Sequence, residues 1–220
     1  MGVAELHLDQ QLLTIYARLF FYGDAAFPLL CEDVAREIQN TWNEPRASVM
    51  MQQMSCTVQF KMEAIYAPAL QPEDVMANTN PENNYFRIEE YSANDISFVD
   101  GLNSNTGYFK LANLLNNSTT AAHECGHTLG LDHPEILDIR GSGVPGIMYP
   151  RGSLVDPRFQ YDPNIAAGQK GGTINPFHRK VLQQDIDNLQ LHKLNFSKNG
   201  KAVVGAFTSV WHQKHLPVHD

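Results

Sequence analysis

The chain has 220 residues, which is long enough for one full hydrophobic core and short for two large domains. Hydrophobic residues make up 43% of it, so a globular protein is expected, and its net charge of −8 argues against nucleic acid or an anionic membrane surface as a partner. No run of about eighteen apolar residues occurs, so we expect no membrane-spanning segment.

The N-terminus and the cysteines bear on location. Residues 1–7 lack the basic and apolar regions of a signal peptide. We expect an extracellular protein, present as a mature form or exported without such a signal, rather than a cytoplasmic one. Cys31, Cys56 and Cys125 are odd in number and have no paired spacing, so they are not a disulfide framework, although pairing of any two stays open.

The first half of the chain alternates between strand and helix patterns. Residues 10–22 are rich in β-branched and aromatic residues and predict a central strand. Apolar residues then recur at three and four over 27–42, which predicts an amphipathic helix that ends at Pro45. Residues 56–66 alternate as a strand with one wetter face does.

Loops and short strands follow. Residues 67–82 hold three prolines and are predicted to be a loop, and 85–91 a strand. The polar stretch 92–107 is expected to be a loop with a short strand at 96–99. Calcium could bind such an oxygen-rich loop, but no EF-hand spacing is present, so an ordinary loop is favoured. A short strand at 108–111 precedes the next motif.

The motif H-E-x-x-H lies on a predicted helix whose N-cap is Ser118 or Asn117. His123 and His127 are four residues apart, so their imidazoles project from one helix face about one turn apart. Glu124 lies beside that face, where its carboxylate can hold a water bound to the same metal ion.

A third histidine extends the motif. Six residues beyond His127, His133 would have rotated about 240° away and risen roughly 9 Å if the helix continued. We therefore predict that the helix ends at Gly130, because glycine accepts the left-handed conformation that terminates helices. Three neutral imidazoles around a divalent cation, with one position left open, are typical of one catalytic Zn²⁺ rather than a structural ion.

The extended motif resembles that of the metzincin zinc metallopeptidases, in which a methionine-containing turn follows the third ligand. Residues 146–150 read Gly-Ile-Met-Tyr-Pro at a plausible distance, and the resemblance makes Met148 the apolar floor beneath the three imidazoles. It implies an α/β (α+β) fold: a twisted, mostly parallel sheet, two helices above the cleft, and a small loop-rich lower subdomain with a C-terminal helix. One catalytic domain would then comprise an upper subdomain, 1–133, and a lower subdomain, 134–220.

Two details resemble different metzincins. Tyr149-Pro150 after the methionine is similar to matrix-type enzymes, in which this segment walls the pocket for the residue after the scissile bond. Pro134 directly after the third ligand is similar to the serralysins. Serralysins and astacins place a metal-binding tyrosine two residues beyond the methionine; here that residue is Pro150, so no tyrosine ligand is expected.

The remaining chain offers weaker patterns. Residues 151–175 are predicted to be irregular and 176–191 a C-terminal helix. By resemblance, Asp185 would bond the methionine turn, and an exposed helix-surface aspartate is the alternative. Asn199-Gly200 predicts a hairpin between 193–196 and 202–207. Beyond it we expect a solvated polar tail, with weak metal binding as the lesser alternative for its histidines. These are His212, His215 and His219.

The resemblance implies a monomeric zinc metalloendopeptidase acting on protein or peptide substrates. Glu124 would take the proton of the attacking water and pass it to the departing amine. The peptide would lie along the strand near 107–111. The substrate pocket would be lined by Tyr108, Tyr149, Pro150 and Leu154. A catalytically weak binding module and a protease toxin or effector domain remain the alternatives, and the intact Glu124 disfavours the former.

Overall fold

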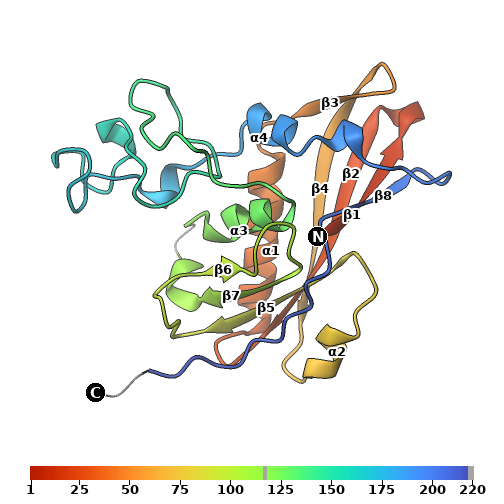
Figure 1. The fold of residues 1–220 in the computed structure, drawn as a ribbon, viewed down its shortest axis with the longest axis horizontal. Coiled ribbons are helices and arrows are strands. Elements are labelled where there is room, and N and C mark those ends of the chain that lie inside the picture. The colour runs from red at the N-terminus through yellow and green to blue at the C-terminus, as the bar shows by residue number, and fades with distance from the viewer. Residues whose placement is uncertain (116–117, 218–220) are drawn as a thin grey trace.

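The structure is a computed structural model that describes residues 1–115 and 118–217. Eight strands form one sheet in the order β3-β4-β2-β5-β7-β6, with β1 beside β2 and β8 beside β1 (Figure 1). The strands are β1 Gly2–His7, β2 Leu12–Tyr22, β3 Ser48–Met51, β4 Met54–Tyr66, β5 Asn83–Glu89, β6 Phe98–Val99, β7 Thr106–Lys110 and β8 Lys201–Val204. The helices are α1 Pro28–Asn43, α2 Pro72–Met76, α3 Thr120–Thr128 and α4 Gln183–Asn188.

The sheet is mixed. Strands β4, β2, β5 and β7 run parallel, as strands joined by crossovers do. Strands β1, β3, β6 and β8 add antiparallel pairings at its margins. The α/β (α+β) class predicted from the sequence agrees with this architecture, but "mostly parallel" describes only the inner four strands.

Helix α1 fixes the position of the motif helix. Pro28 opens α1, where its missing N–H costs nothing, and the apolar face that begins with Leu30 and ends with Trp42 is buried. Burial of each large apolar side chain there contributes about 1.5–3 kcal/mol to folding. The Trp42 indole packs against Phe60 of β4 with its ring tilted by 48°, and its Nε1 donates to the Ala122 carbonyl of α3 at 3.0 Å. One side chain thus ties the sheet, α1 and α3 together.

Two helical predictions are corrected. The segment 67–82 contains the short helix α2, which Gln71 and Asp74 cap reciprocally. The helix predicted over 176–191 is instead a 3₁₀ turn, Pro176–His178, then α4, and a second 3₁₀ turn, Leu191–Lys193. The chain stays extended after His178 because the Lys180 amide bonds the Pro145 carbonyl at 3.0 Å, a tertiary contact that outweighs local helix propensity.

The predictions for 193–220 are also corrected. A turn does lie at 197–200, but β8 pairs with β1 rather than with residues 193–196. The segment after β8 packs on the sheet (Figure 1): Trp211 stacks on Tyr22 with ring centroids 4.6 Å apart, and His215 stacks on Tyr108 at 4.0 Å. It is therefore no solvated tail up to residue 217, and His219 lies outside the described residues.

Regular structure nearly stops after His133. Residues 134–182, which we call the loop-rich region, hold two 3₁₀ turns, Pro157–Phe159 and Pro176–His178, and extend to one side of the sheet (Figure 1). They have a small core of their own, built on Ile139, Val155 and Ile174. The division into subdomains 1–133 and 134–220 stays a prediction. Among the described residues, no helix is long and apolar enough to cross a membrane.

Candidate metal centre

Helix α3 presents the first two histidines. It begins at Thr120, and the residue before it, Thr119, has a left-handed backbone and makes no side-chain cap. The predicted N-cap Ser118 lies one residue earlier, and its hydroxyl accepts a long bond of 3.4 Å from the Thr120 amide. The other predicted N-cap, Asn117, lies outside the described residues.

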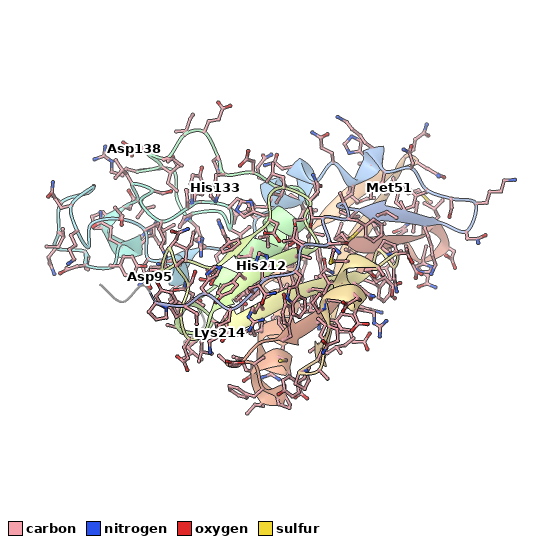
Figure 2. All side chains as sticks on the ribbon, turned by 60° about the horizontal axis from the view of Figure 1, so that its bottom comes forward. Met51, Asp95, His133, Asp138, His212 and Lys214 are labelled. Atoms are coloured by element: carbon pink, nitrogen blue, oxygen red, sulfur yellow. The ribbon has the colours of Figure 1, made fainter. Side chains whose placement is uncertain are left out.

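The helix ends where the motif requires. Gly130 has φ of +104°, the conformation that glycine adopts most easily. The Gly130 amide bonds the His127 carbonyl at 3.0 Å, and the Leu131 amide bonds the Gly126 carbonyl at 2.9 Å. This pair of hydrogen bonds is the Schellman C-cap motif. The reversal brings His133 back to the helix face, between the loop that carries Asp138 and the sheet side of the molecule (Figure 2).

The three imidazoles converge through their Nε2 atoms. The Nε2 atom of His133 lies 3.1 Å from that of His123 and 3.0 Å from that of His127. The Nδ1 atoms of His123 and His127 lie 2.7 Å from the carbonyl oxygens of Ile147 and Leu131. Carbonyls only accept, so these Nδ1 atoms carry the protons, and both Nε2 atoms present lone pairs.

This donor set fits a zinc ion. At most one of the three Nε2 atoms, that of His133, can carry a proton while the rings are neutral, so the lone pairs need a cation. Zinc binds imidazole nitrogen at about 2.0–2.1 Å, which places neighbouring ligand atoms roughly 3.3 Å apart. Burial lowers the pKa of all three histidines, well below the ordinary value for His123, and so favours the neutral form that binds metal.

Calcium finds no comparable site. Among the described residues, the three histidines are the group of ligating side chains that could hold an ion. In the polar loop, Asp95 pairs with Lys110, and Asp100 Oδ2 accepts from Thr106 Oγ1 at 2.5 Å and from His212 Nε2 at 2.9 Å. These carboxylates already have protein partners, and calcium prefers several free oxygens. The calcium alternative gains no support.

The methionine segment lies under the histidines. Met148 is 3% exposed, and its thioether occupies the space beside Gly126 of α3, where any Cβ would collide with Sδ. The preceding carbonyl, of Ile147, holds the His123 ring. Asp185 is buried beside this turn, accepts from the Leu182 amide at 2.7 Å, and has a pKa that burial raises and backbone bonds from Leu182 and Ile147 lower. The structure places Asp185 against the turn rather than on an exposed surface.

A cavity of about 240 Å³ opens beside the histidines. Among the described residues, Glu124, which is 7% exposed, contributes the one carboxylate to the lining of the cavity. Burial raises the pKa of Glu124 to about 8, against the pull of the Arg179 charge and the Val99 amide. Besides Glu124 and the histidines, the polar side chains that line the cavity are Ser97, Asn113, Thr120, Arg151 and Arg179.

Of the four residues predicted to line the substrate pocket, one lines this cavity and three lie elsewhere. Pro150 lines the cavity. Tyr108 does not, because it is fully buried under the C-terminal segment, with its hydroxyl donating to the Tyr91 carbonyl at 2.8 Å. Tyr149 packs on the small core of the loop-rich region, and the Leu154 backbone pairs with residues 137–139.

The strand expected to receive substrate is also not free. Strand β7 pairs with β5 on one side and with β6 on the other. The outer strand on this side is β6, and the residues just before it, Ile96 and Ser97, line the cavity.

Arg179 carries no sequence signal and was not predicted. It is 3% exposed, and its contacts come from Thr119 and Tyr149, far away in the sequence. Only the folded arrangement brings it to the cavity.

Comparisons with known proteins do not identify a family for this chain, so any functional assignment depends on the residues described above. No protein-family model matches the chain, and no curated protein sequence matches it. A solved structure titled "Structure of myroilysin" aligns at 15% identity over 56% of this chain and 51% of that chain, with a TM-score of 0.30. The alignment thus spans about half of that chain, and a likeness this low carries no weight for fold or function.

Proposed function

We propose that this protein is a zinc-dependent endopeptidase of the metzincin type. The observation that carries the proposal is the convergence of three imidazole nitrogens, two with fixed lone pairs, beside one cavity that holds a buried carboxylate. A bound zinc ion would supply an acidified water and polarise the substrate carbonyl.

The protein's own groups perform the remaining tasks. The carbonyl oxygens of Ile147 and Leu131 orient the rings of His123 and His127 and leave their Nε2 lone pairs directed at one point. Glu124, whose buried carboxylate lines the cavity beside His123 and His133, would take a proton from the attacking water and return it to the departing amine. The substrate would lie along the β6 side of the cavity, beside Ile96 and Ser97.

The test is the Glu124→Gln variant. Gln has nearly the shape of Glu, so fold and zinc content should be retained, while removal of the general base lowers the peptidase rate by about 10²–10⁴-fold. The measurements are elemental analysis, thermal melting and cleavage of a mixed peptide library. A variant that cuts at the wild-type rate refutes the role of Glu124. An unmodified protein that binds zinc and cleaves no peptide would instead support the binding module.

A further inference from the structure

Arg179 is a buried cation that has no anionic partner among the described residues. Its Nε donates to Thr119 Oγ1 at 3.3 Å and its Nη1 to the Tyr149 carbonyl at 3.1 Å, and both acceptors are neutral. It forms no ion pair with any carboxylate that the structure describes. Burial lowers its pKa to about 10, so it remains charged at neutral pH. A buried charge left without a counterion is unfavourable, and an anionic ligand would relieve it.

Arg179 lines the same cavity as His123, Glu124 and His133. Arg151, an exposed residue, adds a second cation to the lining and donates from Nη2 to Asn113 Oδ1 at 2.9 Å. The described residues thus give the cavity two guanidinium groups and one carboxylate, and a divalent cation on the histidines would add further positive charge. An acidic ligand is the one that this charge distribution favours.

A purely structural role for Arg179 would be to balance Glu124 and Glu37, whose charges act on it from a distance. Neither carboxylate forms an ion pair with it. The planar guanidinium has five donors in a fork that matches a carboxylate, and Nη2 has no hydrogen-bond partner among the described residues. Arg179, which lines the cavity, therefore has capacity for one more acceptor.

We propose that Arg179, assisted by Arg151, binds a carboxylate of the substrate next to the scissile bond, so that the enzyme prefers acidic peptides. This inference rests on the proposed peptidase function. The carboxylate can come from an Asp or Glu side chain or from the C-terminus of a short peptide. Both sources present the same two oxygens to the guanidinium, so experiment must separate them.

The first experiment uses the unmodified, zinc-loaded protein. Peptides identical except for Glu or Gln directly before or after the scissile bond are compared. A second pair ends at the residue after the scissile bond, with either a free C-terminal carboxylate or an amide. Charge-assisted bonds to a carboxylate should favour the acidic member of one pair by about tenfold in kcat/KM. The preferred pair identifies the source. Equal rates in all pairs overturn the proposal and leave the peptidase assignment standing.

Equilibrium binding separates the two proposals. Zinc-loaded Glu124→Gln protein, which should not cleave, is titrated with the same pairs, and the acidic peptide should have a Kd about tenfold lower. That difference in a protein whose unmodified form cleaves nothing would support the carboxylate site and refute the peptidase. Equal Kd values overturn the carboxylate site, whatever the catalytic result.

Variants locate the contact. Arg151→Gln should reduce the acidic-to-neutral ratio about threefold, whereas Arg158→Gln, the same charge change on an exposed arginine of the loop-rich region, should leave it unchanged. An equal loss in both would mean a general charge effect and overturn the proposal. Arg179→Lys keeps the charge and loses the fork, so it should slow the acidic peptide more than the neutral one. Equal slowing of both peptides would show a structural role alone.

Discussion

The sheet region, residues 1–133, and the loop-rich region, 134–182, stabilise their parts of the site in different ways. In the first, a large apolar core holds α3 through α1 and β4, so His123, His127 and Glu124 are positioned by packing. The second region has a core of its own of only three buried residues, which buries little apolar surface, and it is otherwise held by scattered backbone hydrogen bonds. That region nevertheless supplies Met148, Arg151 and Arg179. The part of the site that carries His123, His127 and Glu124 thus lies on the large core, and the floor and cavity wall depend on contacts with that part.

The largest expected effect comes from removing the ion. His127→Ala removes one of the three ligands, so it should lose most of the zinc and all measurable activity. It should also lower the free energy of unfolding, because metal binding to the folded state stabilises that state. The loop-rich region should then exchange amide hydrogens much faster, while β2 and β4 change little. Elemental analysis and hydrogen exchange measure both effects, with the exposed His192→Ala as control. Normal zinc content in His127→Ala would refute the ligand assignment.

Met148 tests the floor that joins the two regions. Met148→Glu buries a carboxylate without a partner at a 3% exposed position, which should cost several kcal/mol, on the order of the 2–7 kcal/mol for an unpaired polar group, and reduce zinc content. Met148→Leu nearly preserves volume and should cost under about 1.5 kcal/mol. Zinc content, peptidase rate and melting temperature are measured for both. Loss of zinc from Met148→Leu at an unchanged melting temperature would show that the sulfur coordinates.

Local patterns predicted much of the sheet region. Strand β2, helix α1 and the break at Gly130 depend on periodicity and capping that a short stretch of chain contains. Strands β1 and β3 were missed because short strands form only through their partners. The loop-rich region was predicted least well. Its residues, Arg179 above all, acquire their environment from segments far away in the sequence, and no single residue type announces that.

Gly126 gives a smaller effect at the same junction. A Cβ at this helical position would collide with Met148 Sδ and lie 3.4 Å from the Trp42 ring. Gly126→Ala should therefore destabilise the protein by about 1–3 kcal/mol despite the better helix propensity of alanine. A double-mutant cycle with Met148→Val should show coupling, because the smaller side chain leaves room for the new methyl group. Additive changes in unfolding free energy would mean that Met148 does not pack there.

The smallest effect concerns Glu37 of α1, which faces Arg179 across the two regions. Burial raises the pKa of Glu37 to about 7, opposed by the Thr41 hydroxyl and by Arg179. The folded state thus keeps a proton that the unfolded state releases near its ordinary value of 4.5, so this group makes stability fall as pH rises from there to about 7. Glu37→Gln removes the penalty. With allowance for solvent screening it should add about 1 kcal/mol above pH 7, or roughly 2–4 °C in melting temperature, and little at pH 4.5.

The exposed Glu32→Gln on the same helix is the matched control and should show no such pH-dependent gain. If Glu37→Gln lowers the melting temperature at pH 8 while Glu32→Gln does not, the attraction between Glu37 and Arg179 outweighs the burial of the carboxylate. Arg179 would then already have its counterion on the sheet side, and the loop-rich region would be held by an ion pair across the junction. A gain at pH 8 means that burying the Glu37 carboxylate costs more than its attraction to Arg179 contributes, so Glu37 is not the counterion of Arg179.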